Sequence, residues 1–429
     1  RDLRARAVPC RCSCVVLMAP TDDRKIIPVI GNSAVHVGHG LLTRIAAELT
    51  PKNGIKASRF VIVSDVNVWA LYGQKLVDSF LALGNFKQPG GDGAEVGDDA
   101  KLLLTYQVEA GEVSKSRKVK DAIEDFMLQH LCNRDTCMIA LGGGVVGDLV
   151  GFVAATYMRG VPFIQVPTSS TAMIDSSVGG KTAINVPAGK NLIGAFHQPL
   201  IVYADLDCLA TLGRRELVEG IAEAIKMGCI RMPSLFEALE AAPARVMDLE
   251  RSLIESVIYD SVRGKAEVVA ADEKEAGLRG TLNWGHTVGH AVEALKSPAL
   301  MHGECVAIGC VVEAELSLRM GNSNLSREKI ERVTRCFASY GLPIHVPHEL
   351  DVGMLMKKMA LDKKNQGTSI RCTIVTDIGV SLTNPQPVDK KLMEAVMAES
   401  AAAGRALGVD WKPHKGNHDV EVAGGQMAH

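Results

Sequence analysis

The fold of this chain is constrained most strongly by a predicted strand that is followed directly by a cluster of glycines. Thr136–Leu141 (TCMIAL) is followed at once by Gly142–Asp148 (GGGVVGD), with the spacing G-x-G-x-x-G. Glycines at the end of a strand permit a tight turn and a close approach of the backbone to a phosphate at a helix N-terminus. The motif is weak alone, because a turn needed only for packing explains it about as well. It also lacks the acidic residue that the standard dinucleotide fingerprint has about 20 positions later.

Strand-like and helix-like segments alternate around this motif, which predicts a parallel sheet with right-handed crossovers. The strand candidates are Arg59–Ser64, Thr136–Leu141 and Phe163–Val166, and the helical patterns are Leu41–Leu49 and Val68–Leu83. From about Arg214 the pattern turns helical. We therefore predict an α/β domain over residues 25–212, an all-α domain over 213–401 and a frayed tail over 402–429. An exposed insertion loop is expected at Gly84–Ala100.

Composition excludes several classes of function. The 429-residue chain has a formal net charge of −2 and 4% aromatic residues, so nothing favours binding to nucleic acid or to an anionic membrane. No apolar run approaches the ~20 residues that a membrane-spanning helix needs. The 11 cysteines are odd in number and spread over a long chain, which favours a reducing compartment over a disulfide framework.

The first 20 residues contain four arginines and a single acidic residue, Asp2. Such a composition is typical of the end of an organelle transit peptide. Residues 1–24 are therefore predicted to be the remnant of a transit peptide, and the protein is predicted to reside in a plastid. The alternative location is the cytoplasm.

Three histidines in the segment Arg279–Glu304 (RGTLNWGHTVGHAVEALKSPALMHGE) indicate a metal site. His286 and His290 are four residues apart and would share one face of a helix, and His302 follows nearby. Two imidazoles on one face and a third close by are typical of divalent-metal ligands. A pair of core histidines without a metal is the alternative.

A second predicted helix, Arg215–Ile230, offers a carboxylate to the same site. Its apolar residues at core spacing are Leu217, Ile221 and Ile225, and its charged residues Glu219, Glu223 and Lys226 share another face. A solvated charged face is the simpler interpretation of that pattern. Small residues surround Glu223, however, which would let its carboxylate approach a metal and complete a Glu-His-His set with an open position.

Several cations accompany these candidate ligands. Lys181 lies in VGGKT (Val178–Thr182), which lacks the first glycine of a P-loop, so an NTPase is rejected. Lys181 and Lys190 suit anion binding, with two surface lysines as the alternative. Counting back from His286 on a helix, Asn283 and Arg279 fall on nearly one face. With Lys226 these groups imply a small polyanionic substrate, such as one with a phosphate and a carboxylate.

Taken together, these segments resemble the 3-dehydroquinate synthases, a family of sugar phosphate cyclases, and most of all the synthase module of pentafunctional arom proteins. The resemblance covers about Ile26 to Ala395. Its specific motifs are GEVSKS (Gly111–Ser116), GGGVVGDLVGFVAATYMRG (Gly142–Gly160), QVPTS (Gln165–Ser169), DSSVGGKTAIN (Asp175–Asn185), GKNLIGAFHQP (Gly189–Pro199), AEAIK (Ala222–Lys226), NWGHTVGHAVE (Asn283–Glu293), HGE (His302–Glu304) and DKKN (Asp362–Asn365).

The resemblance implies an α/β NAD-binding domain followed by a helical, metal-binding domain. It implies zinc, with cobalt as an alternative, on Glu223, His286 and His302, and it makes His290 a proton-transfer residue that contacts substrate instead of a ligand. The implied NAD contacts are Asp65, Asn67, Glu112, Lys115, Gly143, Gly144, Val145, Asp148, Thr168, Ser169 and Thr211.

The resemblance also implies a substrate site. The implied catalytic residues besides His290 are Glu275, a proton acceptor in the family, with Lys226, Lys265, Arg279 and Asn283. The implied substrate-binding residues are Asp175, Lys181, Lys190, Asn191, Arg159 and Lys363, with Lys364 as the alternative to Lys363. Arg159 matches an arginine that reaches the neighbouring subunit, so a homodimer is expected.

The implied reaction closes 3-deoxy-D-arabino-heptulosonate 7-phosphate into 3-dehydroquinate with loss of phosphate, a step of the shikimate pathway, without net oxidation. Three other functions stay open at this point. Another sugar phosphate cyclase would share the NAD and zinc residues. A metal-dependent polyol dehydrogenase would show net production of NADH, and a metal-stabilised binding protein would be preferred only if neither cofactor bound.

Overall fold

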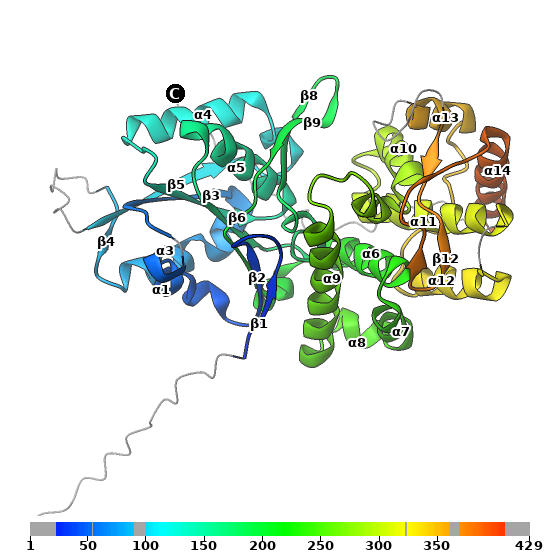
Figure 1. Cartoon of the computed structure of the whole chain (residues 1–429), viewed down its shortest axis with the longest axis horizontal. Helices are drawn as coiled ribbons and strands as arrows, with labels where there is room; N and C mark the ends of the chain where they lie inside the picture. Colours follow the sequence, from blue (N-terminus) through cyan, green and yellow to red (C-terminus); the bar gives the residue numbers. More distant parts are fainter. Residues whose placement is uncertain (1–22, 54, 90–99, 322–323, 361–368, 408–429) are drawn as a thin grey trace, which may run out of the picture.

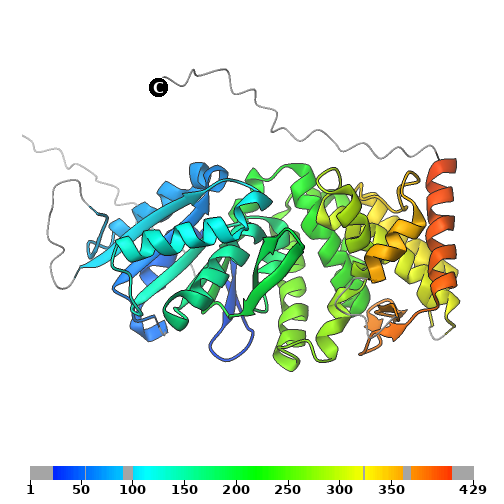
Figure 2. The ribbon, with the colours of Figure 1, turned by 90° about the horizontal axis from the view of Figure 1, so that it is seen from above.

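The computed structural model describes residues 23–53, 55–89, 100–321, 324–360 and 369–407. A sheet-containing part and a helical part lie side by side in both views (Figure 1 and Figure 2). Four predictions lie outside the described residues: the transit peptide with its plastid location, the centre of the insertion loop at 90–99, Lys363 with Lys364, and the tail beyond residue 407.

The sheet of the first part has eight strands in the order β1-β2-β10-β7-β6-β3-β5-β4. Its strands are β1 (Lys25–Pro28), β2 (Ala34–Gly38), β3 (Arg59–Asp65), β4 (Phe86–Lys87), β5 (Lys101–Val108), β6 (Thr136–Gly142), β7 (Phe163–Pro167) and β10 (Ile201–Asp205). All neighbours pair in parallel except β1 and β2. The predicted parallel sheet is confirmed, including the three strands expected from sequence.

Side chains of the central strands alternate between two cores, as the period of a strand requires. In β3, Phe60 and Ile62 join one buried cluster, and Val61 and Val63 join the other. Helices α1 and α3 cover one face of the sheet, and α4 and α5 cover the other (Figure 1). A strand buried on both faces needs the continuous apolar run that the sequence has there.

Short helices connect the strands of this part. They are η1 (Leu41–Thr43), α1 (Ile45–Glu48), η2 (Pro51–Asn53), α2 (Val66–Val68), η3 (Trp69–Gly73), α3 (Gln74–Leu81), η4 (Glu112–Ser114), α4 (Arg117–Gln129), α5 (Gly144–Thr156), η5 (Tyr157–Arg159), η6 (Ala172–Ser176) and η7 (Leu206–Thr211). The predicted helix Leu41–Leu49 is wrong in detail, since it divides at Arg44 into two short turns. A hairpin of β8 (Lys181–Val186) and β9 (Gly189–Phe196) projects on the side of the helical part (Figure 1).

The second part is built mainly of helices. They are α6 (Arg214–Ile230), α7 (Pro233–Ala241), α8 (Pro243–Met247), α9 (Arg251–Ala271), η8 (Leu278–Asn283), α10 (His286–Lys296), α11 (His302–Arg319), α12 (Arg327–Ser339), α13 (Val352–Ala360) and α14 (Lys390–Ala406). Two small antiparallel ladders pair β11 (Arg371–Cys372) with β14 (Gln386–Pro387) and β12 (Val375–Asp377) with β13 (Val380–Ser381). The part is therefore helical, as predicted, but not all-α.

Three details of the helical part differ from the sequence predictions or bear on them. Arg279 and Asn283 belong to a 3₁₀ helix that ends before α10, so they do not share a helix face with His286. Gly285, with φ 79°, separates the two helices. The chain stays helical to Ala406, past the predicted start of the tail. Among the described residues, no helix is long and apolar enough to cross a membrane.

Candidate active site

The glycine turn lies where the connections of the parallel sheet diverge. Strands β3 and β6 are neighbours, with Ser64 opposite Leu141, and the chain leaves their carboxyl ends toward opposite edges of the sheet. Such a point is where open α/β sheets bind nucleotides. Helix α5 begins at Gly144, directly after β6. Its first-turn N–H groups therefore face the crevice, which suits a pyrophosphate.

Neighbouring hydroxyl groups leave little room for a side chain at two of the glycines. A Cβ on Gly144 would lie 2.8 Å from the Ser176 hydroxyl, and one on Gly143 would lie 3.3 Å from the Ser169 hydroxyl. Contacts under 3.0 Å force atoms to move, so a side chain at Gly144 would displace the turn after β7. This crowding fits the alternative of a turn needed for packing, and the predicted close approach to a phosphate stays a prediction.

The predicted NAD contacts all lie at or after the carboxyl ends of parallel strands. Asp65 is the last residue of β3 and Asn67 follows it. Beyond the other strands lie Glu112 and Lys115 (after β5), Gly143, Gly144, Val145 and Asp148 (after β6), Thr168 and Ser169 (after β7) and Thr211 (after β10). The fold thus brings together eleven residues that the sequence separates by almost 150 positions. One edge of the sheet forms the candidate nucleotide site.

Several of these residues already have structural partners. The Asp65 carboxylate accepts from the backbone N–H of Asn67 and of Val68, both at 3.0 Å, and so caps α2. Lys115 forms an ion pair with Asp148. Burial raises the pKa of Asp148, and the Lys115 ammonium opposes that rise. These contacts hold in place the segments that carry these predicted NAD contacts.

Three helices bring the metal candidates together. Glu223 comes from the middle of α6, His286 is the first residue of α10, and His302 is the first residue of α11. His302 Nε2 lies 3.2 Å from Glu223 Oε1, and His286 Nε2 lies 3.6 Å from the same oxygen. The donor atoms of these three residues all lie within 4.8 Å of one another. One oxygen and two imidazole nitrogens at this spacing match the donor set that zinc prefers.

The environment of Glu223 supports a metal fit. The residue is 1% exposed, and no hydrogen bond of acceptable geometry reaches either of its carboxylate oxygens. A buried carboxylate is costly unless it is paired or bound to a metal. Burial would raise the pKa of Glu223, but the neighbouring Lys226 and His302 outweigh it and lower the pKa. The carboxylate is therefore ionised and ready to coordinate.

The alternative that α6 carries a solvated charged face is wrong. Glu223 and Lys226 are 1% and 2% exposed and form an ion pair inside the protein. Apolar residues at core spacing, Leu217, Ile221 and Ile225, are buried as predicted. The helix is buried around most of its circumference, because it lies between the sheet and the other helices (Figure 1).

His290 lies beside the candidate ligands, on the exposed side. Its ring centroid is 4.9 Å from that of His286 and 5.8 Å from that of His302. A second possible donor group joins His290 with Glu293 and His302. His290 is absent from the group that contains the buried Glu223, and its own side chain is exposed.

The predicted substrate cations lie in ion pairs that connect different segments of the chain. Lys181 of β8 pairs with Glu275 at 2.7 Å, and Lys190 of β9 pairs with Glu293 at 2.9 Å. On α9, Lys265 donates to both the carboxylate and the carbonyl oxygen of Asp175, each at 2.7 Å. The charges of the two parts of the molecule thus meet at their boundary, beside the metal candidates.

Arg279, which was predicted to contact the substrate, is almost completely buried. It is 1% exposed and donates to the backbone oxygens of Glu273 and Gly179, the latter at 2.9 Å. Its guanidinium also lies 5.7 Å from the ring centroid of Phe196. Burial lowers the pKa of Arg279, and Glu275 is the largest opposing charge. Arg279 therefore joins the two parts of the molecule through the turn before β8.

Three predicted site residues have a left-handed backbone. The φ angles of Arg159, Asn191 and Glu275 are 70°, 56° and 61°. Residues other than glycine rarely adopt this conformation, and such strain gathers at functional sites. Glu275 accepts from the Asn283 side chain at 2.7 Å as well as from Lys181. Arg159 lies exposed in the turn after α5.

Two carboxylates beside the metal candidates were not predicted as site residues. Glu293 Oε2 lies 2.9 Å from His302 Nδ1. Glu313, which is fully buried, accepts from the backbone N–H groups of Gly285, Thr287 and Val288 at 2.9–3.2 Å, at the start of α10. A sequence signal existed for each. Glu293 is seven residues after His286 on the same helix face, and Glu313 interrupts an apolar helix.

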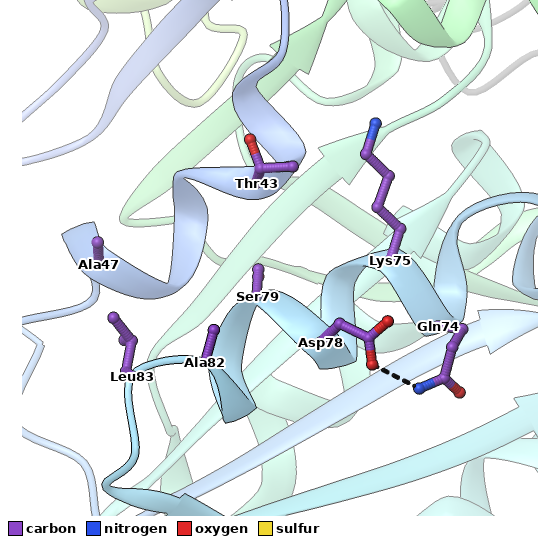
Figure 3. Close-up of a pocket in the computed structure, with 8 residues that line it drawn as sticks. All are labelled: Thr43, Ala47, Gln74, Lys75, Asp78, Ser79, Ala82 and Leu83. Atoms are coloured by element: carbon purple, nitrogen blue, oxygen red, sulfur yellow. Dashed lines mark hydrogen bonds between the residues drawn. The ribbon is translucent and has the colours of Figure 1, made fainter. Parts of the chain in front are cut away.

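A separate hollow of about 630 Å³ lies between α1 and α3 (Figure 3). It is lined by Thr43, Ala47, Gln74, Lys75, Asp78, Ser79, Ala82 and Leu83. Gln74 donates to Asp78, four residues later on α3, at 2.8 Å (Figure 3). It contains none of the predicted site residues.

Solved structures with the same architecture define the fold. A 2-deoxy-scyllo-inosose synthase, solved with carbaglucose-6-phosphate, NAD+ and Co2+, superposes with a TM-score of 0.75 over 88% of this chain and 99% of its own, at 22% identity. A glycerol dehydrogenase from Schizosaccharomyces pombe gives 0.61 over 90% and 94%, at 18% identity. At these identities the likeness concerns the fold alone. The fold is that of the sugar phosphate cyclases and related dehydrogenases.

Sequence comparisons identify the family. Residues 105–219 match the model described as 3-dehydroquinate synthase N-terminal, and residues 220–365 match 3-dehydroquinate synthase C-terminal. The chain belongs to the 3-dehydroquinate synthase family.

Curated and solved relatives agree with this assignment. The chain is 43% identical over 377 residues to the pentafunctional AROM polypeptide of Candida tropicalis, which covers 82% of this chain and 23% of that protein. The chain thus spans about a quarter of the length of these relatives. The 2-epi-5-epi-valiolone synthase ValA of Streptomyces hygroscopicus subsp. jinggangensis, solved with NAD+ and Zn2+, is 26% identical, with a TM-score of 0.73 over 86% of this chain and 96% of its own.

Proposed function

We propose that this chain is a 3-dehydroquinate synthase, a carbon–oxygen lyase that closes 3-deoxy-D-arabino-heptulosonate 7-phosphate into 3-dehydroquinate with loss of phosphate. The observation that carries the proposal is the meeting of a buried Glu-His-His donor group with several cations at one boundary, in a chain of this family. A polyanionic sugar phosphate needs cations that neutralise its phosphate and carboxylate, and the proposed reaction needs a metal that polarises its hydroxyl group.

The cofactors follow from the same geometry. We propose zinc, with cobalt as an alternative, on Glu223, His286 and His302, and NAD at the glycine turn after β6. When bound, zinc supplies Lewis-acid polarisation of a substrate hydroxyl, and NAD supplies a reversible hydride acceptor. The NAD+ and Zn2+ present in the ValA structure support this pairing of cofactors.

The chain's own residues would bind and orient the substrate. Lys181 and Lys190 stand on the exposed hairpin and can donate to the phosphate and carboxylate of the substrate while they remain beside their carboxylate partners. Each charged hydrogen bond gained this way contributes about 1.5–3 kcal/mol. Lys226 keeps Glu223 ionised beneath them. Fixing a flexible sugar in one orientation supplies much of the remaining rate.

Proton transfer is assigned to His290 and Glu275. His290 is an exposed imidazole next to the candidate metal ligands, so its side chain can contact a bound sugar without a change in the helix. Glu275 is held by Lys181 and Asn283, and those partners keep its pKa low against the effect of burial. The lowered pKa keeps Glu275 ionised and able to accept a proton, but makes it a weaker base than a group whose pKa lies near the working pH. We further propose a homodimer in which Arg159, exposed after α5, serves the neighbouring subunit's site.

The test measures phosphate release from the heptulosonate phosphate by the purified protein with NAD, with and without a chelator. NADH absorbance is followed in the same cuvette. Chelator-sensitive phosphate release without NADH accumulation, with a product mass of 3-dehydroquinate, is the expected result. NADH accumulation without phosphate release would assign the chain to the polyol dehydrogenases. A response only to another sugar phosphate would assign it to a different cyclase.

A further inference from the structure

Glu293 joins two parts of the candidate site through its two oxygens. Its Oε2 lies 2.9 Å from Nδ1 of His302, and its Oε1 accepts from Nζ of Lys190 at 2.9 Å. His302 begins α11 and Lys190 lies on the β8–β9 hairpin. The carboxylate side chain is 15% exposed. One enclosed carboxylate therefore contacts both a candidate metal ligand and a candidate substrate lysine.

The contact with His302 fixes which ring nitrogen is available. An ionised carboxylate only accepts hydrogen bonds, so Nδ1 of His302 carries the proton that Glu293 receives. Nε2 is then the nitrogen that faces Glu223 Oε1, 3.2 Å away. A carboxylate behind a metal-bound imidazole sets its tautomer and ring orientation and raises its basicity.

Glu293 could be a metal ligand itself or a residue behind a ligand, depending on which of two possible donor groups holds the metal. In one group His302 acts with Glu223 and His286, and in the other it acts with His290 and Glu293. Both oxygens of Glu293 already have a hydrogen-bonded partner. No hydrogen bond of acceptable geometry reaches Glu223, which is 1% exposed. Nε2 of both His286 and His302 approaches Oε1 of Glu223, at 3.6 and 3.2 Å, so a metal would lie on that side of His302 and Glu293 lies behind the ligand.

We propose that Glu293 is a positioning residue that orients His302 toward the metal and holds Lys190 in place for an anionic substrate. The role of Glu293 toward Lys190 rests on the proposed function, because it involves the substrate. Its role toward His302 does not, because metal binding can be measured without substrate. A lysine held near its working position loses less side-chain entropy when the substrate arrives than a freely rotating one does.

The first experiment measures metal affinity without substrate. The apparent Kd for Zn2+ is determined by competition with a chelator, for the wild-type protein and for Glu293→Ala and Glu293→Gln. We expect Glu293→Ala to weaken zinc binding by about 10- to 100-fold, as the loss of such a partner does. Glu293→Gln keeps an acceptor oxygen for Nδ1 and should recover part of that loss. Wild-type affinity in both variants would overturn the proposal.

The second experiment uses the absorption spectrum of bound Co2+ as a readout of coordination. If Glu293 lies behind His302, Glu293→Ala changes the affinity but leaves the position and intensity of the visible bands close to wild type at saturating Co2+. A change in coordination number would make Glu293 a ligand and overturn the positioning role. Glu349→Gln is the matched control, because Glu349 pairs with Lys296 of the same helix. Its Kd should equal that of the wild type.

The third experiment separates the two oxygens of Glu293. Lys190→Met should leave the Zn2+ Kd within about twofold of wild type and raise the KM for substrate. Glu293→Gln should raise both. A large loss of zinc affinity in Lys190→Met would show that the carboxylate does not act on His302 directly. If the wild-type protein releases no phosphate from the substrate, the proposed function fails while the zinc results still decide the metal part.

Discussion

The two parts of the molecule build their shares of the candidate site from different groups. The sheet part offers backbone N–H groups and glycines at the carboxyl ends of strands, and the turn after β6 is its centre. The helical part offers charged side chains, buried and paired, from α6, α10 and α11. A site made of backbone N–H groups needs glycines, because added side chains would block it. A site made of charged side chains needs neighbouring groups that stabilise each buried charge. Substitutions should therefore act through shape in one part and through charge in the other.

The largest effects are expected among the histidines of the helical part. His302→Ala removes one of three candidate ligands, so zinc should be lost and kcat/KM should fall by about 10³-fold or more. Metal content after dialysis and phosphate release measure the two effects. Stoichiometric zinc in this variant would remove His302 from the ligand set.

His290→Ala provides the matched comparison in the same cluster. Its ring lies near both ligand rings, but the residue is proposed to transfer a proton. We expect zinc to remain and turnover to slow by about 10²- to 10⁴-fold, the range for loss of a general acid or base. Zinc loss here would instead restore His290 as a ligand.

A smaller effect is expected at the helix that carries His286. The buried Glu313 carboxylate accepts from three N–H groups at the start of α10. In Glu313→Gln one oxygen becomes an NH₂ group that cannot accept, so an N–H group is left unsatisfied. The free energy of unfolding should fall by about 1–3 kcal/mol, measured by denaturant titration, and zinc affinity should fall with it.

The control for Glu313 is an exposed carboxylate in the same part. Glu399 of α14 accepts from Arg319 on the surface, and Glu399→Gln should leave the unfolding midpoint unchanged. Equal effects of the two substitutions would mean that the cap on α10 contributes nothing specific. That result would also remove one support from the contrast between the two parts.

In the sheet part, Gly144→Ala tests the role of the bare backbone. The added methyl group would lie 2.8 Å from the Ser176 hydroxyl, and overpacking of this kind costs about 1–3 kcal/mol. NAD affinity, measured by fluorescence or calorimetry, should fall by about tenfold, while zinc content stays at the wild-type level. The double variant Gly144→Ala/Ser176→Ala removes the clash. Recovery of affinity would assign the loss to crowding, and no recovery would contradict that explanation.

The sequence predicted most of what local patterns determine. The central strands, such as β6, and the helix α6 were predicted because their apolar runs are long and their boundaries are marked by glycine. The glycine turn was found from the spacing of its motif. The spacing of the histidines favoured His286 and His290 as a ligand pair, and only the resemblance to the family gave the set Glu223, His286 and His302. Leu41–Leu49 failed because a helix that short depends on packing more than on propensity.

The partners of these residues could not be predicted from one sequence. Lys190 and Glu293 are 103 positions apart, and Lys181 and Glu275 are 94 apart. Their pairing depends on how the hairpin is placed against the helical part, which no local pattern records. The helix-face argument for Arg279 and Asn283 failed for a related reason. Gly285 adopts φ 79° and ends one helix before the next begins.

The smallest effect is expected at the boundary between the two parts, where a lysine of one pairs with a carboxylate of the other. Burial would raise the pKa of Glu275, but Lys181 and Asn283 outweigh it and lower the pKa. A carboxylate with a lowered pKa stabilises the folded state above its unfolded pKa, and this contribution is lost as the pH falls through its folded pKa. Because the Lys181 side chain is 47% exposed, Lys181→Met should cost less than about 1 kcal/mol at pH 7.

That cost should depend on pH in one direction. In Lys181→Met the pKa of Glu275 moves up toward its unfolded value, so the variant has less stability to lose on acidification. The wild type loses its additional stability as Glu275 is protonated, and the two proteins converge at low pH. Denaturant titrations at pH 7, 5 and 3.5 measure the difference in the free energy of unfolding. Asn185→Ala, on the same strand but paired with Glu112, is the control. A difference between wild type and Lys181→Met that grows toward acid would mean that the two parts are not joined through this ion pair.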